Sequence, residues 1–439
     1  MGRRTLPLAR QLSESESLPT TVLLQRQLDS LRSLLRHAQT NCPYYWDHKL
    51  PDPDRVTSLN DLNAIPFLTR DALREHHPRM SWANAPHRLL LGHTHGTSDE
   101  PLSFIWDRSR QAWDKANRLR GHAWHGFNIG DRELHLWPID PPFDFAGRFK
   151  QRLREHRDAL TAESQIDSLA LLDGRITPPD AWAQWRVFNP TRVTAYPSAL
   201  CDLIQQGRDA GLEIGNPDLR AVFLTGEVTF DWQRRLIESA LNVPTIQCYG
   251  LQEVGAIAFA CPRGRWHVCA ESAIVEIIRN GRPAQPGELG EIVITGLQSY
   301  AMPMIRYRTG DIARAEKPCE CPCGRTLPVM PPILGRINDF LETTDGDWLV
   351  PEAVISSCSE ILPPSCFRIT QDSNGDVDVH VVESDEWPIN WQARVIQHMR
   401  DIVGRFRICS VRPAPSLRRS AFGKCRYVTS QRSRAYHMK

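Results

Sequence analysis

The strongest constraint on the fold is an alternation of short β-rich runs with helical stretches, from about residue 40 to residue 335. The runs are rich in β-branched and aromatic residues, as strands usually are. They occupy residues 133–137, 193–196, 221–225, 245–249 and 291–295, and helical candidates at 198–211 and 230–241 lie among them. Strands that alternate with helices in this way predict an α/β domain whose sheets are covered by helices.

The pattern changes after Arg336. Asp345-Gly346 and Asn374-Gly375 each separate two apolar-rich runs, which is typical of a β-hairpin. Helices are expected at about 351–362 and 390–403, and a last strand at 408–411. Together these elements form a compact α+β unit of about 100 residues, an ordinary size for a domain. We therefore expect a large N-terminal domain over residues 1–335 and a small C-terminal domain over 336–439.

Composition argues against several classes of protein. The chain has 439 residues, of which 41% are apolar and 24% charged, and its formal net charge is +2. That balance gives no electrostatic reason to expect a nucleic-acid partner. No apolar run has the length of a membrane span, and the basic N-terminal residues are not followed by the apolar stretch of a secretory signal. We therefore expect a cytoplasmic protein without nucleic-acid or membrane partners, as a monomer or a homodimer.

Five separated segments have the residue types of a nucleotide-binding enzyme. Glycines and hydroxyl residues in loops can hold phosphates, and carboxylates can bind Mg²⁺ or ribose hydroxyls. The segments are Thr-His-Gly-Thr-Ser-Asp-Glu-Pro at 94–101, Leu-Thr-Gly-Glu at 224–227, Tyr-Gly-Leu-Gln-Glu-Val-Gly at 249–255, Ile-Arg-Tyr-Arg-Thr-Gly-Asp at 305–311 with Leu-Gly-Arg-Ile-Asn-Asp at 334–339, and Ser-Ala-Phe-Gly-Lys-Cys-Arg at 420–426. In this order they resemble the signature segments of the adenylate-forming superfamily, most closely its phenylacetate-CoA ligase-like and capsule-biosynthesis branch.

The resemblance extends from about residue 40 to residue 430. It implies a large N-terminal α/β domain with helix-covered sheets and a small, mobile α+β C-terminal domain. It also implies that the first segment holds the ATP phosphates through hydroxyls and backbone N–H groups, and that the backbone of the second lies along the adenine. The residues concerned are Thr94, Gly96, Thr97, Ser98, Gly226 and Glu227. Taken alone, each segment would be an ordinary polar loop or turn.

The third segment is the more specific one. By the resemblance, Tyr249 packs against the adenine, with Gly250 beside it, and Glu253 binds Mg²⁺. A carboxylate suits this role because Mg²⁺ is a hard ion that takes one or two carboxylates together with phosphate oxygens. Gln252 stands where many members have Thr or Ser near the α-phosphate. The alternative is a buried aromatic residue followed by a surface glutamate.

The fourth segment supplies the implied ribose contacts. Asp311 would accept hydrogen bonds from the ribose hydroxyls, as acidic residues do in other nucleotide-binding folds. Arg336 would contact ribose or phosphate, unless it forms only a surface salt bridge. Asp339 would be the pivot between the two domains, at the position where the sequence pattern changes.

The resemblance makes Lys424, in the fifth segment, the catalytic lysine. An ammonium is a compact cation that can lie between a substrate carboxylate and the α-phosphate while charge redistributes. Asp99 and Glu100 stand where the family usually has Gly and Lys, so two carboxylates replace a cation in the first segment. Lys424 is therefore the clearest cation assigned to the phosphate charge. The alternative is an exposed lysine in a basic tail.

A cluster of cysteines and one histidine predicts a zinc site. The 12 cysteines are scattered along the chain, which argues against a disulfide framework. Cys261, His267, Cys321 and Cys323 would give three sulfurs and one nitrogen, a set typical of structural Zn²⁺. Cys319 or Cys269 could replace one of the four. The alternative is a group of buried free thiols beside a core histidine.

The resemblance implies ATP-dependent activation of a small carboxylic acid, aromatic or short, to an acyl-adenylate with release of pyrophosphate. Transfer to coenzyme A as a thioester would follow. Residues near Trp137, 196–198 and 254–258 are expected to line the acid pocket. A second hypothesis keeps the activation but transfers the acyl group to an amine, a hydroxyl or a carrier-protein thiol in biosynthesis. A third, motivated by Asp99 and Glu100, is a zinc-containing binding module without turnover.

Overall fold

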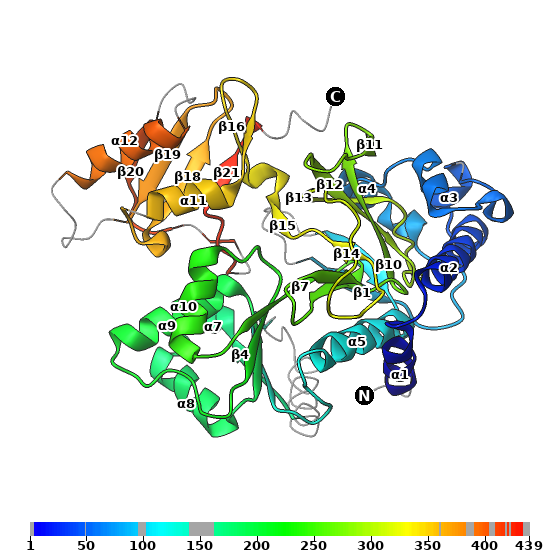
Figure 1. The fold of residues 1–439 in the computed structure, drawn as a ribbon, viewed down its shortest axis with the longest axis horizontal. Helices are drawn as coiled ribbons and strands as arrows, with labels where there is room; N and C mark the ends of the chain where they lie inside the picture. Colours follow the sequence, from blue (N-terminus) through cyan, green and yellow to red (C-terminus); the bar gives the residue numbers. More distant parts are fainter. Residues whose placement is uncertain are drawn as a thin grey trace.

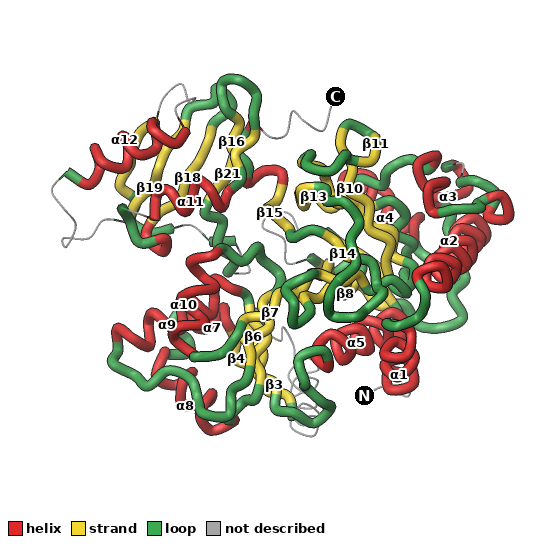
Figure 2. Tube along the Cα trace, in the orientation of Figure 1, coloured by secondary structure: helices red, strands yellow, loops and turns green. Residues whose placement is uncertain are grey.

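The computed structural model describes residues 4–48, 50–94, 102–139, 162–359, 361–382, 390–403, 409–417, 419–420 and 423–432. Figure 1 shows the C-terminal elements, in orange and red, at one end of the molecule and the N-terminal helices, in blue, at the other. Helices flank the sheets, as Figure 2 shows. The predicted fold class is confirmed, with an α/β N-terminal part that has helix-covered sheets and a smaller α+β part after it.

An eight-stranded sheet contains most of the predicted strands. Its order is β14-β9-β8-β7-β6-β5-β3-β4, parallel from β4 to β7 and antiparallel from β7 to β14. The strands are β3 Glu133–Trp137, β4 Glu163–Asp167, β5 Arg192–Ala195, β6 Ala221–Leu224, β7 Thr245–Leu251, β8 Gly255–Ala260, β9 Trp266–Val268 and β14 Val329–Met330. Parallel neighbours need crossover connections. The helices after β4, β5 and β6 provide them: α7 Ser168–Leu172, α8 Pro178–Phe188, α9 Pro197–Asp209 and α10 Asp231–Leu241.

The two faces of this sheet differ because successive strand residues point to opposite sides. On one face, Leu136, Val193 and Val222 are fully buried in a core that includes Trp182 and Trp185 of α8. Burial of apolar side chains stabilises the fold by about 25 cal/mol per Å². On the other face, His135 of β3 and Thr194 of β5 line a cavity together with Phe223 of β6. The sheet is thus a core wall on one side and a site wall on the other.

A second, five-stranded sheet has the order β11-β10-β12-β13-β15 and is antiparallel throughout. Its strands are β10 Ala273–Arg279, β11 Arg282–Pro283, β12 Leu289–Gly296, β13 Tyr307–Arg314 and β15 Ile333–Arg336. Ile292 and Ile294 of β12 share a core with Leu31 and Leu35. The N-terminal elements are α1 Thr5–Ser15, α2 Thr20–Asn41, α3 Tyr44–Asp47, α4 Arg70–Met80, the β1 Leu90–His93 and β2 Ser103–Trp106 hairpin, and α5 Arg108–Ala123.

The C-terminal part contains both predicted hairpins. β16 Leu341–Glu342 pairs with β17 Trp348–Leu349, and β18 Phe367–Gln371 pairs with β19 Val377–Val381. The second pair is flanked by β20 Cys409–Pro413 and β21 Val428–Ser430 in a sheet of order β20-β19-β18-β21. The helices are α11 Pro351–Ser359 and α12 Trp391–Val403. The core of this sheet also includes Phe230 of the N-terminal part. The domain boundary at 335/336 stays a prediction.

Within the residues that the structure describes, no helix combines the length and the apolar character needed to cross a membrane.

Candidate active site

A cavity of about 810 Å³ lies where the C-terminal part meets the two large sheets. It is lined by predicted site residues from widely separated positions in the sequence. These residues are Thr94, Gly226, Glu227, Tyr249, Gly250, Glu253, Asp311, Arg336, Asp339 and Lys424. The structure therefore brings together the five segments that the sequence singled out, as far as they lie in the described ranges.

Asp311 links the third and fourth segments. Its Oδ2 accepts a hydrogen bond from the Tyr249 hydroxyl at 2.8 Å. Its Oδ1 lies 3.3 Å from Nε of Arg336, which is its cross-strand partner on β15. Asp339 in turn accepts two hydrogen bonds, one from the backbone N–H of Arg336 at 2.9 Å and one from Nε of Arg426 at 3.0 Å. One carboxylate thus aligns an aromatic ring and a guanidinium along the cavity wall.

Glu253 lies in the turn between β7 and β8, and its residue is only 5% exposed. Its Oε1 accepts a hydrogen bond from the Tyr307 hydroxyl at 2.9 Å. Within the described part of the chain, no cationic group pairs with it at salt-bridge distance. A buried carboxylate that faces a cavity with a single neutral partner is well suited to bind a divalent cation.

Two residues of α5 fix this turn, and no sequence motif pointed to them. Arg110 donates from Nε to the carbonyl of Val254 at 3.1 Å and from a second nitrogen to the carbonyl of Gln252. One helical turn later, Asp114 Oδ1 accepts from the N–H of Ala256 at 2.7 Å. The carbonyls on either side of Glu253 are therefore held by one guanidinium. Arg110 and Asp114 bind backbone atoms, so the side chains of the turn do not reveal these contacts in the sequence.

The Gly226–Glu227 turn contacts the segment of Lys424 directly. Nζ of Lys424 donates to the carbonyl of Gly226 at 2.7 Å and lies 4.7 Å from the centroid of the Tyr196 ring. Glu227 accepts from the N–H and hydroxyl of Ser198, at 3.0 and 2.9 Å, and from the N–H of Cys425 at 3.1 Å. Gly226 has a φ of +79°, and a Cβ there would lie 2.3 Å from the Tyr196 ring, so this position requires glycine.

Burial lowers the pKa of Lys424 to about 8, although the carboxylate of Glu227 acts in the opposite direction. Arg336 adds to the lowering through like-charge repulsion. Removing an ammonium from water disfavours its charged form, which is why the ordinary lysine value is not kept. The amine therefore titrates close to neutral pH. This is the range in which a lysine can act both as a cation and as a proton donor.

Thr94 of the first segment is hydrogen-bonded to Leu102, on the other side of its own loop. Its hydroxyl accepts from the N–H of Leu102 at 2.9 Å, and its own N–H donates to the Leu102 carbonyl at 2.8 Å. These bonds close the base of the loop between β1 and β2. Gly96, Thr97 and Ser98 lie outside the described residues.

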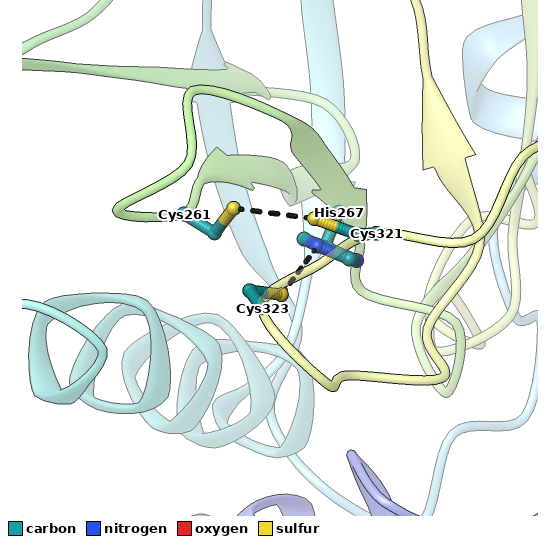
Figure 3. A group of neighbouring side chains, drawn as sticks. All are labelled: Cys261, His267, Cys321 and Cys323. Atoms are coloured by element: carbon teal, nitrogen blue, oxygen red, sulfur yellow. Dashed lines mark hydrogen bonds between the residues drawn. The ribbon is translucent and has the colours of Figure 1, made fainter.

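The predicted metal-binding set also comes together (Figure 3). The ligand atoms of Cys261, His267, Cys321 and Cys323 all lie within 4.8 Å of one another. Nδ1 of His267 lies 3.0 Å from the carbonyl of Leu327, and Nε2 lies 3.2 Å from the sulfur of Cys323. A backbone partner on one ring nitrogen orients the other as a ligand, as in many zinc sites.

Neither alternative cysteine joins this group. Cys319 lies 2.9 Å from a guanidinium nitrogen of Arg265, and Cys269 is fully buried beside Arg120. The geometry therefore favours the set of three cysteines and one histidine over the sets that contain Cys319 or Cys269.

The chain is similar to known proteins in sequence and in structure. No protein-family model matches it. A phenylacetate-coenzyme A ligase of Thermus thermophilus is 26% identical over 452 residues, which cover 95% of this chain and 99% of that protein. A solved structure of 2-hydroxyisobutyryl-CoA ligase in the postadenylation state has a TM-score of 0.74 at 20% identity and covers 96% of this chain and 93% of its own. The same enzyme in the thioesterification state has a TM-score of 0.59 at 19% identity and covers the same shares.

The fold is that of the adenylate-forming ligases. In sequence the chain is similar to phenylacetate-coenzyme A ligases from several bacteria, at 26–27% identity, in agreement with the resemblance that the motifs indicated.

Removal of the α5 support should loosen the turn that contains Glu253. Asp114→Ala deletes the charged acceptor of the Ala256 N–H, so we expect amide exchange in the 249–256 peptide to accelerate roughly 10- to 100-fold. Hydrogen–deuterium exchange with mass spectrometry measures this. Gln111→Ala, at an exposed position on the same helix, is the control and should leave the exchange unchanged. Equal exchange in Asp114→Ala and the parent would show that the contact does not hold the turn.

Proposed function

We propose that this protein activates a carboxylic acid with Mg·ATP, giving an acyl-adenylate and pyrophosphate, and then transfers the acyl group to coenzyme A. The observation that carries the proposal is the placement of Lys424, Glu253 and Asp311 around one cavity, from three separate segments of the chain. The likeness in sequence to phenylacetate-coenzyme A ligases supports the same activity.

ATP would bind along the wall formed by the third and fourth segments. The Tyr249 ring offers a flat surface for the adenine, and Asp311 offers carboxylate oxygens to the ribose hydroxyls. Glu253 would hold Mg²⁺, which supplies charge neutralisation at the phosphates. Tyr307 and the two carbonyls bound by Arg110 keep the Glu253 carboxylate and its backbone in place.

Lys424 would stabilise the charge that moves during the first step. The substrate carboxylate attacks the α-phosphate, one oxygen–phosphorus bond forms, and the bond to pyrophosphate breaks. A preorganised cation beside these oxygens stabilises the transition state without reorganisation at the moment of reaction. Its contact with the Gly226 carbonyl, at 2.7 Å, holds Nζ at the cavity without neutralising it.

The second step would require the C-terminal segment to leave this position. Three contacts would have to break: Lys424 with Gly226, Cys425 with Glu227, and the ion pair between Arg419 and Asp202 at 2.6 Å. Asp339 would be the pivot. The TM-score is higher to a postadenylation structure than to a thioesterification structure of the same ligase, 0.74 against 0.59, so the present arrangement is more like the former.

We also propose that Cys261, His267, Cys321 and Cys323 bind a structural Zn²⁺. Four protein ligands would complete a tetrahedral site and leave no open position for chemistry. The ion would connect the segment after Glu253 to the segment after Asp311. The two proposed nucleotide contacts would then be held at a fixed separation.

The proposed reaction is tested by acid-dependent release of pyrophosphate. We expect release from Mg·ATP with at least one acid in a panel of aryl, arylacetic and short aliphatic acids, and a coenzyme A thioester identified by product mass. Formation of an amide, an ester or an acylated carrier protein, but no coenzyme A thioester, would show that the acceptor is of the second type. An intact chain that releases no pyrophosphate with any acid would contradict the activation itself.

The role of Lys424 is tested by substitution and by pH. Lys424→Ala should lower the rate of adenylate formation about 10²- to 10³-fold with an unchanged melting temperature, because one preorganised charge is lost. In the parent, the cation is present below pH 8 and is lost as the pH rises through about 8, so kcat/KM for ATP should fall above that pH. Lys424→Arg keeps the charge and should remove this alkaline limb. The same limb in all three proteins would refute the assignment.

The metal proposal is tested on the purified protein by elemental mass spectrometry. We expect about one zinc per chain, and nearly none in Cys261→Ser, which also should melt several degrees lower because metal binding contributes to folding. Cys319→Ser is the matched control, since this exposed thiol lies in the same segment as Cys321 and Cys323 but outside the set of four. Loss of zinc in Cys319→Ser but not in Cys261→Ser would overturn the ligand set.

A further inference from the structure

The cavity continues beyond Lys424 along the polar face of the eight-stranded sheet. In the register of the parallel strands, His135 of β3 lies between Gln165 of β4 and Thr194 of β5, and Thr194 lies beside Phe223 of β6. All four residues line the cavity. They form one cross-strand row, two residues deeper than Trp137 and Tyr196.

Helix α5 forms the wall opposite this row. Lys115, Arg118 and His122 line the cavity, and their spacing of three and four residues places them on one face of the helix. The cavity between the sheet and α5 therefore has charged or polar groups on both sides. Pockets for small apolar ligands are lined predominantly by apolar side chains. Phe223, at the end of the row, belongs to a second hydrophobic core, so the polar groups of this wall are concentrated on β3, β4 and β5.

The negative charge of Glu133, in this region, is compensated by Arg192. Glu133, next to His135 on the same face, is bound by Nε of Arg192 at 3.0 Å and by the hydroxyl of Thr194 at 2.7 Å. Neighbouring cations hold the pKa of its carboxyl well below the ordinary value despite its burial. Glu133 and Arg192 thus form a satisfied structural pair.

Arg118 is different. Its nearest carboxylate oxygen, Oε1 of Glu133, is 3.6 Å away, beyond hydrogen-bond distance, and its side chain is 39% exposed. Within the described residues it makes no hydrogen bond, so its guanidinium offers several N–H donors to the cavity. His135 Nε2 is likewise 3.7 Å from Glu133 and too far for a hydrogen bond. The deep end of the cavity therefore contains a guanidinium that is ion-paired with Glu133 but whose N–H groups make no hydrogen bond within the described residues.

We propose that the acid activated at this site is aromatic and has an oxygen substituent, hydroxyl or carboxylate, at the end far from the activated carboxylate, and that Arg118 binds this oxygen. This inference rests on the proposed acid activation. The rings of Trp137 and Tyr196 pack against each other with centroids 4.2 Å apart, and Nζ of Lys424 lies 4.7 Å from the Tyr196 ring. His135 lies two strand residues deeper, about 7 Å along β3, which suits a single aryl ring with its substituent.

Matched pairs of acids test the proposal: benzoate against 4-hydroxybenzoate and terephthalate, and phenylacetate against 4-hydroxyphenylacetate. Acid-dependent pyrophosphate exchange gives kcat/KM for each. We expect the oxygenated member of at least one pair to be preferred about 100-fold, because a site built around polar donors rejects an analogue that leaves them unpaired. The hydroxyl and carboxylate arms distinguish the two substituents.

Arg118→Met removes the donors but keeps most of the aliphatic stem. It should reduce the preference about tenfold or more by raising KM for the oxygenated acid, with KM for ATP unchanged. Arg108→Met is the matched control, an exposed arginine on the same helix outside the cavity lining. If Arg118→Met does not fold, Arg118→Gln, which keeps a polar head but removes the charge and most of the donors, serves for the same comparison.

Each outcome bears on one proposal. Activation of the bare acids as efficiently as the oxygenated ones, or a preference that survives in Arg118→Met or Arg118→Gln, would overturn the assignment and leave acid activation intact. No exchange with any acid would contradict the activation itself. An oxygen preference that is lost with Arg118 supports both.

Discussion

The carboxylate of Glu227 is the contact on which the assembly of the site depends. It accepts hydrogen bonds from Ser198 at the start of α9 and from the backbone of Cys425, and so joins the eight-stranded sheet to the segment that contains Lys424. A single carboxylate can do this because its two oxygens together accept several hydrogen bonds. The contact of Lys424 Nζ with the Gly226 carbonyl and the ion pair between Arg419 and Asp202 reinforce this junction on either side.

The sequence predicted the fold class and many of its elements, but it made no prediction of the order of the strands. The run at 133–137 coincides with β3, and both Asp-Gly and Asn-Gly turns connect paired strands. Local patterns suffice here, because turn chemistry and β-rich composition act over a few residues. The strand order, with β3 between β4 and β5, depends on long-range packing. No local pattern indicates it.

The same contrast holds for the site. Tyr249, Asp311 and Lys424 stand in recognisable motifs, and the structure gathers them around one cavity. Arg110 and Asp114 were not predicted, because their partners are backbone atoms far along the chain. The hydroxyl of Thr94 is occupied by Leu102 within its own hairpin, which a motif could not reveal. Motifs identify groups that act on a ligand, whereas the groups that support them become visible only in three dimensions.

The two-sided character of β3 and β5 has a consequence for how such an enzyme can diverge. Successive positions of β3 have different neighbours: Leu134 and Leu136 lie in the core, His135 lines the cavity, and Trp137 both lines the cavity and packs against that core. Substitutions at sites without shared partners are usually additive. Lineages can therefore explore new substrates by changing every second residue, while the intervening residues keep the scaffold intact. Because successive residues of β3 point to opposite faces of the sheet, positions that contact the core and positions that line the cavity alternate within five consecutive residues.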